Sequence, residues 1–156
     1  MKHAIDPTID CVFKAILGSN EHINLLLNFL NAICKDDLQS PIQDLTIVNP
    51  YNDKIFLNDK LSIVDIKAND KDGNTFQIEI QISVPQSLKY RMLHNWAELY
   101  SRQLTEGETW NKLQPVISIW LVCEPIFRDY SGFHSCFTFR DEKNNLELAE
   151  HAKYTS

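Results

Sequence analysis

In the segment 74–83, residues 76–83 alternate apolar and polar side chains without interruption, and this pattern limits what the chain can fold into. The apolar positions are Phe76, Ile78, Ile80 and Ile82, and the polar positions are Gln77, Glu79, Gln81 and Ser83. Successive side chains of a β-strand point to opposite faces of the sheet. The segment therefore predicts a strand with one face in the core and another that carries amide, carboxylate and hydroxyl groups.

A second strand-like segment, residues 61–68, precedes this one across a short turn. If residues 71–73 form a three-residue hairpin loop, Gly73 takes the left-handed position that this loop type requires. The two strands then pair so that Asp65 falls directly opposite Glu79. The Cβ atoms of such a cross-strand pair lie roughly 4.5–5.5 Å apart.

Two carboxylates at that separation repel each other unless a cation lies between them. Asp and Glu oxygens suit a hard divalent ion such as Mg²⁺ or Mn²⁺. A polar strand face is more often simply solvated, and a register slip of one residue would separate Asp65 from Glu79. The pattern alone leaves both interpretations open.

The remaining elements follow from periodicity and from helix and turn signals. Helices are predicted from Pro7 to Gly18 and over residues 20–34 and 87–104, and strands over residues 45–48, 61–68, 74–83, 115–123 and 133–139. The order ααβββαββ predicts an α+β (mixed α/β) fold, in which helices flank a small mixed β-sheet. We expect residues 1–156 to form a single domain, because about 100–200 residues is the usual size.

The helix over residues 87–104 carries two distinct faces. One face collects Arg91, Asn95, Glu98 and Arg102, and the opposite one collects Leu93, Trp96, Ala97, Tyr100 and Leu104. We expect the first face to meet solvent and the second to pack on the sheet. Arg91 is then either a solvated side chain or a contact for a phosphate near the carboxylates.

Composition and targeting signals exclude several classes of protein. Hydrophobic residues make up 44% of the chain, which is too many for a disordered protein. The four cysteines form no C-x-x-C pair, which argues against a zinc ribbon or a dense disulfide framework. The start of the chain has no signal-like apolar region, and no apolar run is long enough to span a membrane. A cytoplasmic location without membrane contact is the default expectation.

Several short motifs, in this order and spacing, together resemble a known family. They are Asp6-Pro7-Thr8, Asp10-x-x-Phe13-Lys14, Val64-Asp65-Ile66, Asp70-x-Asp72-Gly73, Ile78-Glu79-Ile80-Gln81, Arg91, Tyr100-x-x-Gln103-Leu104, Gly107 and Leu113-x-Pro115-Val116-Ile117-x-Ile119. The chain resembles the PD-(D/E)XK nuclease superfamily and, more closely, the Rpn family of recombination-promoting nucleases and transposases. The resemblance covers roughly residues 6–123 and implies a PD-(D/E)XK nuclease-like core.

The resemblance implies a metal-dependent DNA endonuclease, a hydrolase of low sequence specificity associated with recombination or mobile elements. It assigns Asp65 as the metal-binding acid, Glu79 as the acid of the (D/E)XK element and Gln81 as its third position. The main-chain carbonyl of Ile80 is implied as a further metal ligand. The implied cofactor is Mg²⁺, with Mn²⁺ or Ca²⁺ as alternatives. Such a cation activates a water molecule and offsets the charge that develops on the phosphate.

Gln81 departs from the lysine of the superfamily pattern, although the Rpn-like pattern itself carries glutamine here. An amide can orient water or phosphate only through hydrogen bonds. A cation would then come from elsewhere, and Lys67 and Lys14 are candidates. Asp10 is either an accessory acid or half of an ordinary i, i+4 helix pair with Lys14.

Members of the family usually continue past the length of this chain, so we expect it to lack the family's C-terminal extension. A missing strand would expose a sheet edge and favour self-association, for example as a homodimer. This gives an alternative function: a catalytically inactive or truncated nuclease relative that acts as an interaction or regulatory protein.

Net charge limits how the chain engages nucleic acid. It carries 15 Lys and Arg against 21 Asp and Glu, a formal charge of −6, which argues against a broad DNA-coating surface. The one segment with a positive balance is residues 86–115, which holds Lys89, Arg91, Arg102 and Lys112. We therefore expect weak, metal-dependent binding of DNA. The sequence does not distinguish DNA from RNA as the substrate.

Overall fold

The computed structural model describes residues 13, 16–35, 38, 40–48, 66–148 and 152–155, with side chains up to residue 148. Within these ranges the helices are η1 (Asn20–His22), α2 (Ile23–Ile33), α3 (Leu88–Ser101) and η4 (Trp110–Lys112). The strands are β1 (Leu45–Val48), β2 (Ile66–Asp70), β3 (Thr75–Gln81), β4 (Val116–Val122), β5 (Cys136–Thr138) and β6 (Ala152–Thr155). No helix in the described part of the chain is both long and apolar enough to cross a membrane.

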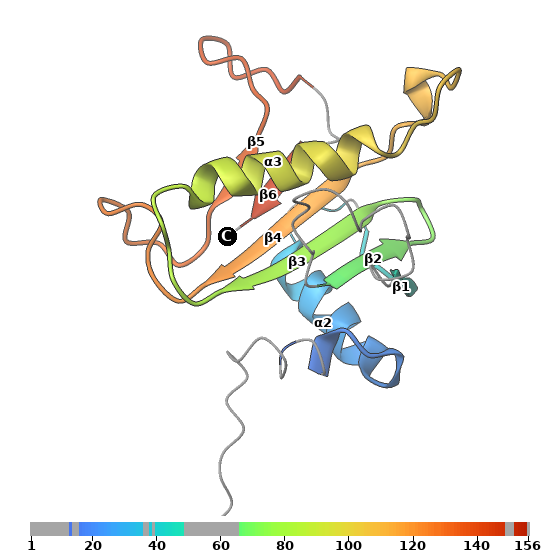
Figure 1. Cartoon of the computed structure of the whole chain (residues 1–156), viewed down its shortest axis with the longest axis horizontal. Helices are drawn as coiled ribbons and strands as arrows, with labels where there is room; N and C mark the ends of the chain where they lie inside the picture. The colour runs from blue at the N-terminus through green and yellow to red at the C-terminus, as the bar shows by residue number, and fades with distance from the viewer. Residues whose placement is uncertain are drawn as a thin grey trace, which may run out of the picture.

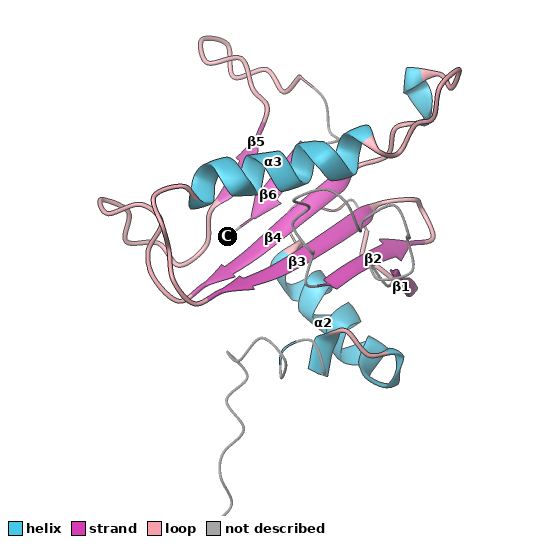
Figure 2. Cartoon of the chain, viewed as in Figure 1, coloured by secondary structure: helices cyan, strands magenta, loops and turns pink. Residues whose placement is uncertain are grey.

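The strands form one mixed sheet in the order β1-β2-β3-β4-β6-β5. The pairs β1/β2, β2/β3 and β5/β6 are antiparallel, whereas β3/β4 and β4/β6 are parallel. Figures 1 and 2 show α3 lying across one face of this sheet and α2 on the other. The predicted mixed sheet flanked by helices is thus confirmed. The sequence had not predicted β6, and β5 is shorter than the predicted strand over residues 133–139.

The hairpin between β2 and β3 has the predicted turn. Gly73 has a φ of +91°, in the left-handed region, and its N–H donates to the carbonyl of Asp70 at 3.3 Å. Asp70 Oδ1 accepts from the main-chain N–H groups of Asp72 at 3.0 Å and Asn74 at 2.9 Å. These bonds close the loop around the carboxylate of Asp70 and set how the two strands align.

The register of this hairpin is also the predicted one. Ile66 pairs with Ile78, and Lys67 pairs with Gln77. The described part of β2 begins at Ile66, so Asp65 lies outside the described residues.

The main core lies between the sheet and α2. Its buried members are Phe13, Leu17, Leu26, Leu30, Cys34, Ile42, Ile66, Ala68, Phe76, Ile78, Ile117 and Ile119. The even-numbered apolar residues of β3 therefore point into this core, as the alternation predicts. Most of the first predicted helix, residues 7–18, lies outside the described residues, although Phe13 and Leu17 of that stretch are buried in the core.

The face that α3 turns to the sheet differs from the predicted one. Asn95 was expected to meet solvent but is only 2% exposed, whereas Leu93 was expected to pack and is 50% exposed. The buried residues Leu88, Met92, Asn95 and Trp96 follow the spacing i, i+4, i+7, i+8. The prediction was therefore wrong for Asn95 and Leu93, but it is confirmed for Arg91 and Arg102, which are exposed, and for Trp96, which is buried.

Candidate active site

The polar face of β3 lies on the side of the sheet that carries α3, and part of it is buried. Gln77 is fully buried and Glu79 is 4% exposed, while Gln81, nearer the end of the strand, is half-buried. The interpretation of this face as an ordinary solvent-exposed strand face is therefore wrong for Gln77 and Glu79. A carboxylate at such a depth is costly unless hydrogen bonds or a cation compensate for its lost hydration.

A chain of hydrogen bonds runs from β4 to the Glu79 carboxylate. Trp120 Nε1 donates to Ser118 Oγ at 2.9 Å, and Ser118 Oγ donates to Gln77 Oε1 at 3.0 Å. Gln77 Nε2 then donates to Glu79 Oε1 at 3.2 Å. The parallel register of β3 and β4 makes this chain, because it pairs Gln77 with Ser118 and Glu79 with Trp120.

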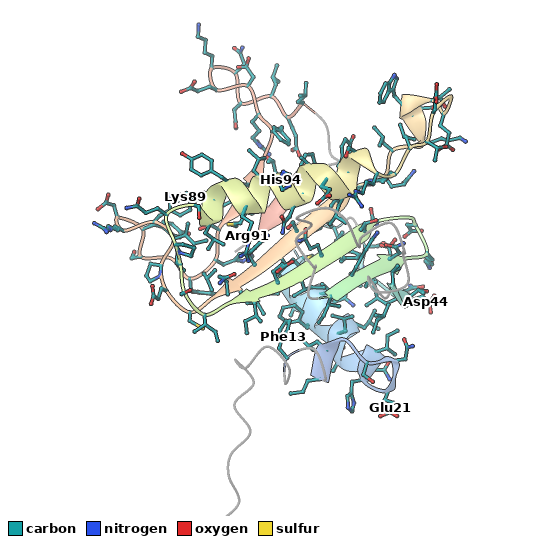
Figure 3. All side chains as sticks on the ribbon, viewed as in Figure 1. Phe13, Glu21, Asp44, Lys89, Arg91 and His94 are labelled. Carbon is teal, nitrogen blue, oxygen red and sulfur yellow. The ribbon has the colours of Figure 1, made fainter. Side chains whose placement is uncertain are left out.

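Arg91 brings a positive charge to the third position of the motif. It lies in the first part of α3 (Figure 3) and donates from Nη2 to Gln81 Oε1. Its Cζ atom lies 5.0 Å from the ring centroid of Trp120, which is a cation–π distance. The guanidinium therefore contacts Gln81, the residue that stands third in the motif.

Of the other predicted site residues, the structure describes Lys67 and Ile80. Lys67 is half-buried and lies on the same sheet face as Gln77, its cross-strand partner. The Ile80 side chain packs against the main core, so only its main-chain carbonyl is suited to a ligand role. Asp10, Lys14 and Asp65 lie outside the described residues.

Among the residues that the structure describes, Glu79 is of the ligand type that a hard divalent cation prefers. The only carboxylate among the described β3 residues, Glu79, is buried on a polar face, and the oxygen donors around it would be carboxylate and carbonyl groups, which Mg²⁺ and Mn²⁺ prefer. Within the described ranges, no group of three or more His, Cys, Asp or Glu side chains is arranged to hold a metal ion. Asp65 falls outside the part of the chain to which that statement applies.

Sequence reasoning missed Ser118 and Trp120. Residues 115–123 were predicted as an apolar strand covered on both faces, and β4 does have five consecutive buried residues. The available signal was the single hydroxyl, Ser118, within that apolar run. A polar side chain in a fully covered strand needs a hydrogen-bond partner, and this one finds Gln77.

Comparison with known families agrees with this geometry. A family model described as PD-(D/E)XK nuclease family transposase matches residues 7–155. The chain therefore belongs to the PD-(D/E)XK nuclease family transposases, and a nuclease or transposase-related role follows. No curated protein and no solved structure matches the chain.

Proposed function

We propose that the protein is a divalent-metal-dependent endodeoxyribonuclease that hydrolyses phosphodiester bonds with low sequence specificity, in recombination or mobile-element DNA. The family supports nuclease-related chemistry. The observation that carries the proposal is the register of β2 and β3, in which Ile66 pairs with Ile78. If the pairing continues by one residue, Asp65 would lie opposite Glu79, and both side chains would lie on the side of the sheet that carries α3.

The Asp65 and Glu79 carboxylates, with the Ile80 carbonyl, would hold Mg²⁺, or Mn²⁺ or Ca²⁺ in its place. When bound, such a cation lowers the pKa of water and polarises the phosphate. Glu79 and Gln81 are two residues apart on one strand, so their side chains address the same point above the sheet. The Gln81 amide orients a phosphate or water by hydrogen bonds, and Arg91 donates to that amide.

Arg91 supports an active enzyme over an inactive relative. Gln81 stands where the superfamily pattern has a lysine, and the guanidinium of Arg91 donates to Gln81, so a cation is present beside this position of the motif. Lys67, on the same sheet face, and Lys14 are further candidates for phosphate contacts, and Asp10 for an accessory acid. The net charge of −6 supports weak, metal-dependent engagement of DNA.

Plasmid nicking across a series of divalent metals tests the proposal. Asp65→Asn and Glu79→Gln each remove one ligand charge with little change of shape. We expect each to lower the nicking rate by more than the roughly 10–100-fold that loss of an outer-shell partner costs. Asp44→Asn is the matched control, because Asp44 is an exposed acid outside the strands and its loss should leave the rate unchanged. Nicking that survives Asp65→Asn would contradict the proposed site.

The inactive alternative makes the opposite prediction. An interaction or regulatory protein would show no heat of Mn²⁺ binding in calorimetry and would form a stable homodimer in light scattering. Labelled RNA offered in competition with the DNA substrate would show whether the same site prefers the other nucleic acid.

A further inference from the structure

We propose that Ser118, together with Gln77 and Trp120, sets the orientation of the Glu79 carboxylate, so that Ser118 is a positioning residue for the metal site. The inference rests on the proposed function, because it assigns a purpose to residues that touch neither substrate nor cation. It starts from three hydrogen bonds of 2.9, 3.0 and 3.2 Å that join four side chains in series.

The series has only one direction of donation. The indole N–H of Trp120 can donate but cannot accept, so the Ser118 oxygen serves as its acceptor. The hydroxyl hydrogen of Ser118 is then directed to Gln77 Oε1. With that oxygen facing Ser118, the amide NH₂ group of Gln77 must face Glu79. The donor-only indole of Trp120 at one end and the acceptor-only carboxylate of Glu79 at the other together fix which end of the Gln77 amide meets the carboxylate.

Burial makes this arrangement hard to replace. Gln77, Ser118 and Trp120 are each 0% exposed, so solvent does not compete for their hydrogen bonds. Without the Ser118 hydroxyl, Gln77 Oε1 would lose its donor, and the amide that donates to Glu79 would no longer be anchored at its other end. Outer-shell hydrogen bonds of this kind orient metal ligands and tune the affinity of the site.

Trp120 also reaches the other half of the motif. Its ring faces the guanidinium of Arg91 at 5.0 Å, and Arg91 donates to Gln81. One buried indole therefore supports Glu79 through its N–H and Gln81 through its ring face. Trp120→Phe separates the two roles, because phenylalanine keeps a ring for Arg91 but has no N–H for Ser118.

The test compares the full chain with Ser118→Ala, Trp120→Phe and the matched control Trp96→Phe. Trp96 is an indole in the same layer whose Nε1 donates to the Val116 carbonyl at 3.0 Å and not toward Glu79. Calorimetry with Mn²⁺ measures metal affinity, and nicking measures kcat and KM separately. We expect Ser118→Ala and Trp120→Phe to weaken Mn²⁺ binding by about 10–100-fold, and to lower kcat more than they raise KM for DNA. Trp96→Phe should leave the Mn²⁺ affinity unchanged.

A metal-free measurement follows the orientation directly. In NMR spectra the side-chain amide protons of Gln77 should exchange slowly with water in the unaltered chain and in Trp96→Phe, and rapidly in Ser118→Ala.

If the unaltered chain binds no Mn²⁺, the proposed function fails, and this inference with it. If the chain binds Mn²⁺ but Ser118→Ala and Trp120→Phe bind it as tightly as Trp96→Phe does, only the positioning role is overturned. If Ser118→Ala does not fold, Trp120→Phe decides between the same two results.

Discussion

At the scale of single residues, Arg91 shows how a side chain on α3 can reach a residue of the strand motif. It lies on the exposed side of α3, yet it reaches back to Gln81 and lies over the ring of Trp120. Arg102, on the same helix, pairs instead with Glu98 four residues away at 2.6 Å. The two arginines have similar chemistry but different surroundings. Comparing substitutions of Arg91 and Arg102 therefore tests whether Arg91 acts in the proposed site or only on the helix surface.

Arg91→Ala should weaken DNA cleavage, because it removes a charged hydrogen bond at Gln81, which is typically worth about 1.5–3 kcal/mol. We expect a fall in kcat/KM of roughly 10-fold or more, measured by single-turnover nicking. Arg102→Ala is the control and should alter cleavage little. Its loss from an exposed i, i+4 pair should change the free energy of unfolding by at most about 0.5 kcal/mol. Equal effects of the two substitutions would argue against a role for Arg91 in the site.

At the scale of elements, the turn between β2 and β3 decides the alignment on which the proposed site depends. Gly73 and Gly107 both have a positive φ, of +91° and +90° respectively. A Cβ at Gly73 would meet Gln114 Cγ at 3.1 Å, whereas one at Gly107 would meet nothing within 4 Å. Comparing the same substitution at Gly73 and at Gly107 therefore distinguishes the cost of backbone strain from the cost of the contact with Gln114.

Gly73→Ala and Gly107→Ala should each destabilise the fold by about 1–2 kcal/mol through the left-handed backbone alone. Gly73→Ala should cost more, because the flexible Gln114 side chain must also move. Urea unfolding followed by tryptophan fluorescence measures both values. If Gly107→Ala is the more destabilising of the two, the contact at Gln114 has no energetic role.

The segment after α3 gives a prediction about pH. The pKa of Glu108 is lowered from its usual 4.5 to about 2, first by the hydrogen bond from the Thr105 backbone N–H and then by the side chains of Lys112 and Thr105. The lowered value means that this carboxylate stabilises the fold fully above pH 4.5, and that the contribution is lost as the pH falls through about 2. An NMR titration of Glu108 should give that value, and Lys112→Met should move it upward. A pKa of 4.5 in the unaltered chain would mean that the loop does not hold the carboxylate in solution.

At the scale of the whole molecule, the acidic surface should govern how DNA binds. With a net charge of −6, few phosphates can be contacted. We expect a plot of log binding constant against log salt concentration to have a slope of about −2 to −4, corresponding to two to four phosphate contacts. Fluorescence anisotropy with Ca²⁺ present measures it, and removal of the metal with EDTA should weaken binding further. A slope near −10 would instead indicate an extensive basic surface.

The hairpin and its register were predictable because short-range rules fix them. Alternation in β3 sets which residues face the core, and the left-handed position of Gly73 sets the loop. Together these fixed the alignment of β2 with β3, the feature on which the proposed pairing of Asp65 with Glu79 depends. Family motifs then linked that alignment to metal chemistry.

The contacts that cross between elements were not predictable in the same way. Asn95 was assigned to solvent because helix periodicity does not say what lies beneath the helix, yet it is buried. The bond from Ser118 to Gln77 depends on the parallel pairing of β3 with β4, two strands separated by α3. β6 has no clear alternation, and its place comes from its neighbours β4 and β5.

The position of β6 has a consequence for the order in which the sheet can assemble. β5 precedes β6 in the sequence, yet among the described strands β5 pairs only with β6, which in turn pairs with β4. During synthesis on the ribosome, β5 therefore emerges before the strand that holds it exists. The β2–β3–β4 region, which carries the proposed site, can form first. Residues 136–138 can pair only after residues 152–155 have been made. Among the described strands, β6 therefore enters the sheet between β4 and β5, which are both made before it.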